Sequence, residues 1–416
     1  MSFIYNNKYD SYKLYLITSI LCALLSIMGE HINTGLIKYL IIFIFIGLSL
    51  ITTLSKRLYK IPSRYGIILF LYIVIMSINA MISPYTEGIK YIIIGASITL
   101  LPFLIFLTSY NYVLAKRDID RIIDYWIYFT IILCCIAFIE TFITHSDVYY
   151  QAAILKIRTV KLGFFASLCN QGVILSLYRY ASSHLPKYKK FAIILSIASI
   201  LTIQLKTILG LLIIWTLFIY FFKQKTKISI LFTIIITVCI GYITISNIPV
   251  LNQKFNKYSV IYSASDSHET TARPALYYQS LNIANDFFPL GSGQGTFGSI
   301  PVNMVYNQVY YDYELSNIYG LGESGENFKM DTHWASIFGE NGYLGTLLYL
   351  LLFLYPISFL KKARGLKYYK TLKFLMISIF LVIGIESITL CLPNTMAFMF
   401  IYAGILGLIC RHITIN

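Results

Sequence analysis

Charged side chains are scarce in this chain of 416 residues. Asp, Glu, Lys and Arg make up 12% of the sequence, hydrophobic residues make up 57%, and the mean hydropathy is +0.71. Soluble domains carry about 25% charged residues, so this composition excludes an ordinary soluble protein. The chain is predicted to be an integral membrane protein.

Motifs for metal or nucleotide binding are also missing. The seven cysteines lie in or beside apolar runs, and no Cys-x-x-Cys pair occurs. The sequence has no Gly-x-x-x-x-Gly-Lys-Ser/Thr loop that could hold the phosphates of ATP. We therefore expect no disulfide framework, no metal site, no cofactor and no ATP-driven work.

Apolar runs of about 20 residues, the length that crosses a bilayer as a helix, recur along nearly the whole chain. Lipid cannot hydrogen-bond a free backbone group, so each run is predicted to be helical. The predicted fold is therefore an all-α integral membrane protein with about 12 transmembrane helices. Their approximate ranges are 13–29, 36–54, 65–82, 89–110, 123–143, 162–180, 190–205, 207–222, 228–246, 334–359, 371–391 and 394–411.

Basic residues alternate between the loops in a way that predicts orientation. If both termini are cytoplasmic, the inner segments contain 23 of the 33 lysine and arginine residues but only four of the 18 acidic residues. Loops rich in lysine and arginine usually face the cytoplasm, and the twelve-helix arrangement with both termini inside agrees with this rule. The net charge of +15 then faces anionic lipid at the inner surface and does not predict nucleic acid as a partner.

One long polar segment divides the chain unequally. Residues 1–246 are predicted to form transmembrane helices 1–9, residues 247–332 a large periplasmic loop domain, and residues 333–416 helices 10–12. Secondary transporters with twelve spans usually have two similar halves, and here the first half has no counterpart of this loop. We expect the chemistry in or beside the loop.

A short amphipathic helix is predicted over residues 271–281, with Pro274 in its first turn. Arg273 would then stand beside free N–H groups, which suits an anionic oxygen such as phosphate. A surface ion pair with Glu269 or Asp266 is the alternative. Four glycines between Gly291 and Gly298 predict either a flexible turn or a backbone that approaches a ligand closely.

His333 stands at the head of the tenth span, where an imidazole could serve as a base near neutral pH. Asp331, or Glu340 two helical turns deeper on the same face, could orient it. The alternative is that His333 anchors the interface together with Trp334.

Lys206 interrupts an apolar region, where an ammonium needs an anion unless it extends to the surface. Lys156, Arg158 and Lys161 form a second basic cluster on the predicted outer side. Together these cations could make a pocket for an anionic head group.

These segments resemble the O-antigen polymerase and O-antigen ligase superfamily. The resemblance rests on Arg273, the stretch Phe288–Phe297, His333 and the stretch Glu340–Gly345. The stretch Leu201–Thr207 is also similar to a family pattern, with Lys206 where arginine is usual. The detailed similarity covers about residues 200–350, and the first six spans match in topology only.

The resemblance implies a glycosyltransferase of the GT-C-like type. Such enzymes transfer a glycan from an undecaprenyl diphosphate carrier to a sugar hydroxyl, without metal or nucleotide sugar. It implies His333 as general base with Glu340 orienting it, and Arg273 and Lys206 as ligands of the donor diphosphate. Lys161 and Arg158 are further phosphate contacts. The implied location is the bacterial inner membrane, with the catalytic loop in the periplasm.

Polymerase and ligase differ in the acceptor, which is another lipid-linked glycan or lipid A-core. The Tyr-rich stretch Tyr306–Tyr313 and the lysine at position 206 favour a polymerase. A non-enzymatic transporter of lipid-linked sugars is the third alternative, and it would not need His333. Expected partners are undecaprenyl-diphosphate-linked oligosaccharide and membrane lipids. A chain-length regulator protein stays open as a further partner.

Overall fold

The computed structural model describes residues 15–21, 44, 46–47, 60–143, 165–202, 204–222, 272–324, 327–395 and 398–415. Within these ranges the protein is all-helical and contains no strand. The principal helices are α3 (Ser63–Ile82), α4 (Ile89–Tyr110), α5 (Lys116–Ile143), α6 (Phe165–Ser183), α7 (Pro186–Leu201), α8 (Leu205–Phe222), α11 (Ala272–Asp286), α12 (Val309–Asp312), α13 (His333–Leu354), α14 (Tyr369–Glu386) and α16 (Leu406–Ile415). Shorter 3₁₀ segments η2 (Ile300–Asn303), η3 (Tyr355–Gly365) and η4 (Leu392–Asn394) and the π-helix η5 (Met399–Ile405) join them.

Five of the described helices are long and apolar enough to cross a membrane. They are Ser63–Ile82, Ile89–Tyr110, Lys116–Ile139, Leu205–Phe222 and His333–Gly365. The all-helical fold is therefore confirmed for the described part of the chain. The count of twelve spans stays a prediction, and most of the first, second and ninth predicted spans lies outside the described residues.

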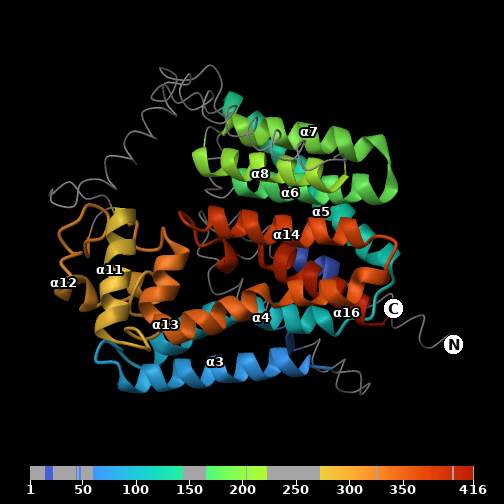
Figure 1. Ribbon diagram of the computed structural model, residues 1–416. Coiled ribbons are helices and arrows are strands. Elements are labelled where there is room, and N and C mark those ends of the chain that lie inside the picture. Colours follow the sequence, from blue (N-terminus) through green and yellow to red (C-terminus); the bar gives the residue numbers. More distant parts are fainter. Residues whose placement is uncertain are drawn as a thin grey trace.

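The long helices run roughly parallel or antiparallel to one another in one bundle (Figure 1). Helix α6 packs on α5 and α7, α14 packs on α6 and α8, and α13 packs on α3 and α11. Helix α7 begins with Pro186, whose missing N–H is harmless in a first turn. Thr202–Gln204 separates α7 from α8, so the break between the predicted spans 190–205 and 207–222 lies before Lys206, which is in α8.

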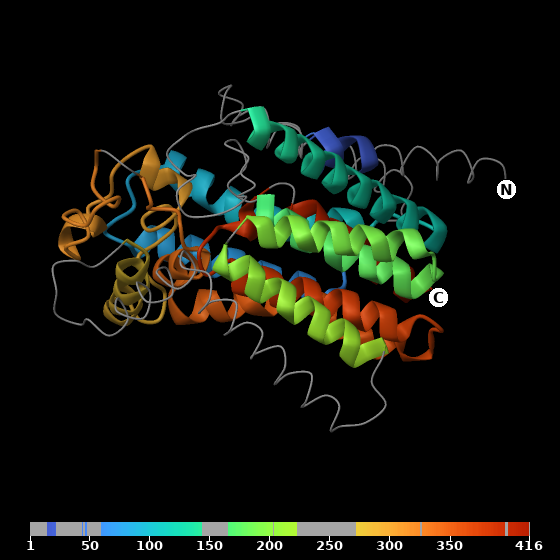
Figure 2. The ribbon, with the colours of Figure 1, turned by 90° about the horizontal axis from the view of Figure 1, so that it is seen from above.

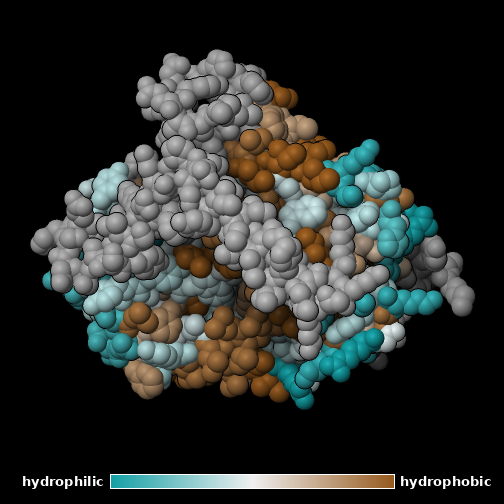
Figure 3. Space-filling model, turned by 45° about the horizontal axis from the view of Figure 1, so that its top comes forward, coloured by the Kyte–Doolittle hydropathy of each residue, from teal (hydrophilic) through white to brown (hydrophobic). Residues whose placement is uncertain are grey.

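The two ends of the bundle differ. Helices α11 and α12 gather at one end, and the chain terminus marked C lies at the other (Figures 1 and 2). Brown apolar side chains fill the middle of the surface between teal polar ones (Figure 3). Helices α3, α5, α7 and α14, each with a basic residue in its first two positions, begin at the end of the bundle opposite α11 (Figure 1). Basic residues at one end of the bundle and the polar segment at the other agree with loops that alternate between the two sides of a membrane. Which end faces the cytoplasm stays a prediction.

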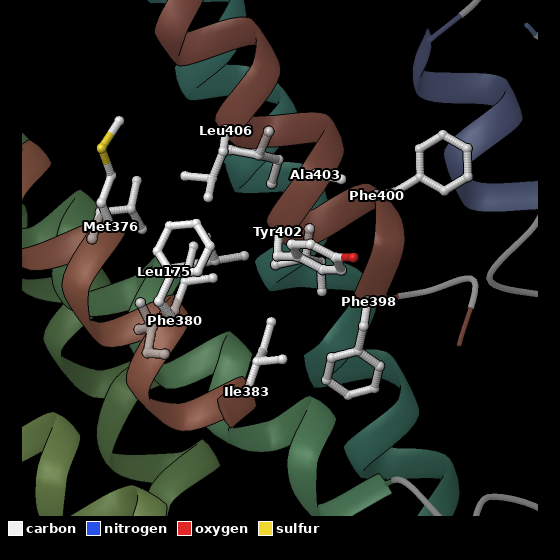
Figure 4. Packing of buried hydrophobic residues seen from close by; sticks show 14 of the residues in the cluster. Leu175, Met376, Phe380, Ile383, Phe398, Phe400, Tyr402, Ala403 and Leu406 are labelled. Carbon is white, nitrogen blue, oxygen red and sulfur yellow. The ribbon is translucent and has the colours of Figure 1, made fainter. Parts of the chain in front are cut away.

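Two hydrophobic cores stabilise the molecule. The larger core joins the bundle helices, and Figure 4 shows Leu175 of α6 and Phe380 of α14 packed beside Leu406 of α16. The smaller core lies under α11 and includes Leu276, Phe297 and Tyr310. Because residues 272–332 bury their own apolar side chains, this part of the chain forms a packed unit at the end of the bundle.

Candidate functional site

The glycine-rich loop is packed onto a break in helix α13. Gly342, inside α13, has φ 59° and ψ −160°, so the helix is interrupted there. The backbone N–H of Ser292 donates to Gly339 O at 2.9 Å, and that of Gly293 donates to Glu340 O at 3.1 Å. These bonds satisfy carbonyls that the interrupted helix leaves without an intrahelical partner.

Glycine is required at this contact because the two backbones touch. A Cβ on Gly291 would lie 2.4 Å from Gly342 N, and a Cβ on Gly342 would lie 2.5 Å from Gly291 N. Both residues also have positive φ. Every residue from Gly291 to Gly298 is buried. The structure therefore shows a buried loop whose backbone closely approaches helix α13, and not a flexible surface turn.

The Glu340 carboxylate fastens the same loop. Its Oε1 accepts hydrogen bonds from Gly295 N at 3.0 Å, from Phe297 N at 3.1 Å and from Ser299 Oγ at 2.5 Å. Glu340 is 1% exposed, so it points inward as predicted. The hydrogen-bond partners of this carboxylate among the described residues are in the loop, and none of them is His333. We therefore assign Glu340 to the positioning of the loop.

Two asparagines complete the attachment. Asn79 of α3 donates to Leu290 O at 2.6 Å and to Glu340 O at 2.7 Å. Asn341 accepts a bond from Gln294 Nε2 at 2.7 Å. The two stretches that carry the family resemblance, in the loop and on α13, are therefore in direct contact.

His333 is the first residue of α13 and is 1% exposed. Its Nε2 lies 2.9 Å from the Tyr349 hydroxyl, and its backbone N–H donates to Ser387 O at 3.2 Å. Its Nδ1 is buried and has no hydrogen-bond partner within the described ranges. The imidazole also packs edge-on against Trp334. One ring nitrogen is thus held by Tyr349, and the other has no hydrogen-bond partner among the described residues.

Arg273 is the second residue of α11, and this helix confirms the predicted one while extending five residues further. Its Nη2 forms an ion pair with Asp331 Oδ2 at 2.8 Å. The predicted partners Glu269 and Asp266 lie outside the described residues. Asp331 is two residues before His333, so this ion pair joins the start of α11 to the start of α13.

Lys206 lies in the first turn of α8, within electrostatic range of Arg273, Asp331 and Glu386. No hydrogen bond or ion pair to its amine is found in the part of the chain that the structure describes. The structure therefore brings the two predicted phosphate ligands, Lys206 and Arg273, to the same end of the bundle as His333. Lys161 and Arg158 lie outside the described residues.

The surface beyond the site pairs tyrosines with carboxylates. Tyr85 donates to Asp312 at 2.8 Å, Tyr313 to Asp286 at 2.8 Å, and Tyr311 to Glu323 at 3.0 Å. Burial raises the pKa of Tyr85 to about 12, and its bond to Asp312 adds to the rise. Hydrogen bonds from Gln308 and Tyr85 lower the pKa of Asp312, so this carboxylate accepts the phenol hydrogen bond in its charged form.

Three residues of this region were not singled out from the sequence. Asp331 was considered only as a partner of His333, and it pairs with Arg273 instead. Asn79 and Glu386 were not considered. Glu386 carried a signal, because a carboxylate inside an apolar span is costly without a partner. Within the described ranges no three His, Cys, Asp or Glu residues gather as metal ligands.

Comparison with known families supports this picture. Residues 191–350 match the family model described as O-antigen ligase. No curated protein matches the chain. The matched range contains α8, α11, the glycine-rich loop and the start of α13, which are the elements that form the candidate site. The resemblance to the O-antigen polymerase and O-antigen ligase superfamily that the sequence predicted is therefore supported over residues 191–350.

Proposed function

We propose that this protein is a polymerase of a lipid-linked surface glycan. In this reaction a hydroxyl of one lipid-linked repeat unit attacks the anomeric carbon of a glycan held on undecaprenyl diphosphate. A new glycosidic bond forms, the bond between that carbon and the diphosphate breaks, and the lipid diphosphate leaves. The observation that carries this proposal is the gathering of Lys206, Arg273 and His333 at one end of the bundle.

His333 is proposed to act as the general base. If Nε2–H donates to the Tyr349 hydroxyl, Nδ1 carries the lone pair, and no described group occupies it. Nδ1 would take the proton of the attacking hydroxyl as the new bond forms. Tyr349 would fix the tautomer and the orientation of the ring, because its hydroxyl contacts the opposite nitrogen.

Arg273 and Lys206 are proposed to stabilise the leaving diphosphate. They come from two different helices, so a diphosphate between them would meet a cation on each side. Fixed cations lower the barrier where negative charge develops, and the half-buried positions of these two side chains strengthen their effect. Arginine also matches phosphate with two parallel N–H groups. No metal is needed in this scheme, because the two side chains supply the positive charge.

The test is chain extension by full-length protein in vesicles that contain purified lipid-linked repeat unit. His333→Gln keeps a polar side chain near Tyr349 but has no basic nitrogen, so we expect folded protein that makes no polymer. Polymer formation at the wild-type rate would remove the general-base role. No product from wild-type protein, with movement of the lipid-linked sugar across the vesicle, would favour a transporter.

A ligase is the second candidate, favoured by the description of the matching family. Polymerase is preferred here because exposed Tyr311 and Tyr319, with acidic partners nearby, offer a surface on which sugar rings could stack. The surface glycan of a strain that lacks the gene separates the two. Loss of a polymerase leaves a single repeat on the core, whereas loss of a ligase leaves bare core.

A further inference from the structure

A buried carboxylate lies behind the proposed diphosphate site. Glu386, the last residue of α14, is 0% exposed. Its Oε1 accepts a hydrogen bond from Asn170 Nδ2 at 2.6 Å, while its Oε2 has no hydrogen-bond partner within the described ranges. A buried carboxylate is costly unless a cation or several donors compensate it. The Ser167 hydroxyl also interacts with this carboxylate, and a nearby positive charge would offset the cost that these two polar groups leave.

The first turn of α8 supplies that charge. Gly210 of α8 packs against Glu386, since a Cβ on Gly210 would lie 2.8 Å from Glu386 Oε1. Lys206 is four residues earlier and therefore lies on the same helix face, one turn nearer the end of the bundle. Its side chain interacts electrostatically with Glu386. The lysine and the carboxylate thus share the α8–α14 contact.

Asn170 of α6 holds the first turn of α8 and the Glu386 side chain of α14 together. Its side-chain amide donates both to Glu386 and to Thr207 O, the latter at 2.8 Å. Ser199 Oγ donates to Asn170 Oδ1 at 2.7 Å, so the amide is oriented from the other side by α7. The backbone beside Lys206 and the carboxylate of Glu386 are therefore attached to one rigid group.

We propose that Glu386 is a positioning residue that holds the Lys206 ammonium opposite Arg273. This inference rests on the proposed function, because the diphosphate is what the two cations would bind. Each cation then has its own carboxylate: Arg273 pairs with Asp331, and Lys206 is balanced by Glu386. Without Glu386 the lysine side chain would extend toward the surface, away from the other cation.

The test measures binding of undecaprenyl diphosphate by full-length protein in lipid nanodiscs. Glu386→Gln retains a carbonyl oxygen for Asn170 but removes the charge, and we expect the dissociation constant to rise about tenfold, as for loss of one partly buried charge interaction. In a Lys206→Met background the same change should alter binding less than about twofold, because the group that it positions is already absent. Glu314→Gln changes an exposed carboxylate of the same region to which no role is assigned, and it should leave binding unchanged.

Gly210→Ala provides an independent variant. The added methyl group would push Glu386 away without removing any charge, so binding of undecaprenyl diphosphate should weaken. In the Lys206→Met background, Gly210→Ala should change binding little. The positioning role alone is overturned if wild-type protein binds undecaprenyl diphosphate and Glu386→Gln weakens binding equally with and without Lys206→Met. It is also overturned if Glu386→Gln weakens binding in neither case. Failure of wild-type protein to bind undecaprenyl diphosphate overturns both this role and the donor part of the proposed function.

Discussion

Replacing Glu340 by alanine should detach the glycine-rich loop from helix α13. Glu340 Oε1 accepts three hydrogen bonds, from Gly295 N, Phe297 N and Ser299 Oγ. The two backbone donors are buried, and an unsatisfied buried donor costs about 1–3 kcal/mol. Two such donors, with a smaller contribution from the partly buried serine, give an expected destabilisation of about 3–6 kcal/mol. Glu340→Gln retains an acceptor oxygen and should cost about 1–2 kcal/mol, the difference between a charged and a neutral hydrogen bond.

Thermal melting of purified protein in detergent, together with limited proteolysis in membranes, measures both effects. Glu340→Ala should lower the melting temperature clearly and make residues 291–299 cleavable by protease. Glu340→Gln should give a melting temperature and a cleavage rate between those of wild type and Glu340→Ala. Glu323→Ala is the matched control, because this carboxylate is exposed and has one partner, Tyr311. A Glu340→Ala protein that melts like wild type and keeps its loop protected would refute the anchoring role.

Three further changes test the site and its support. Gly342→Ala places a methyl group where φ is positive and Gly291 N is 2.5 Å away, so it should destabilise the protein by about 3 kcal/mol or more, and unchanged thermal melting would contradict the packing argument. Arg273→Lys keeps the charge but loses the planar fork, so the KM for lipid-linked donor should rise about tenfold with a smaller change in kcat, and an unchanged KM would speak against diphosphate binding. Tyr349→Phe removes the hydrogen bond to His333 and should lower kcat about tenfold at constant KM, whereas wild-type kcat would mean that the ring is oriented by other contacts.

The helices were the predictable part of the fold. The range 89–110 expected from apolar length is the range of α4, and 65–82 differs from α3 by two residues at its start. Agreement is close because the thickness of the bilayer sets the length of each apolar run. Lipid offers no hydrogen-bond partners, so the backbone of each run must form its hydrogen bonds within a helix. The ends of α13 and α14 were less predictable. After α13 the apolar pattern continues into the 3₁₀ segment η3, and after α14 it continues through turns over residues 387–391.

The sequence was enough to name several residues of the candidate site. Most of the contacts between these residues could not be predicted from it. Arg273 and Lys206 stood out as cations in places where a cation needs an anion, and the structure places them within electrostatic range of each other. The partner of Glu340 could not be foreseen. Helical spacing puts Glu340 below His333, but the break at Gly342 and the docked loop decide which donors reach the carboxylate. Such contacts join residues about 45 positions apart, and no local pattern encodes them.

The packing of the loop also explains how glycines could serve a transfer reaction without touching the substrate. The loop follows α11 directly, and its contact with α13 fixes where α11 ends relative to the bundle. Arg273 is at the other end of α11, tied to Asp331 just before His333. With both ends of α11 attached to α13, the distance between Arg273 on α11 and Lys206 on α8 is set by packed helices, which is what a preorganised site for a diphosphate requires. The glycines would then act through rigidity, and their substitution should reduce donor binding and stability together. Substitution of His333 should instead abolish turnover and leave both largely intact.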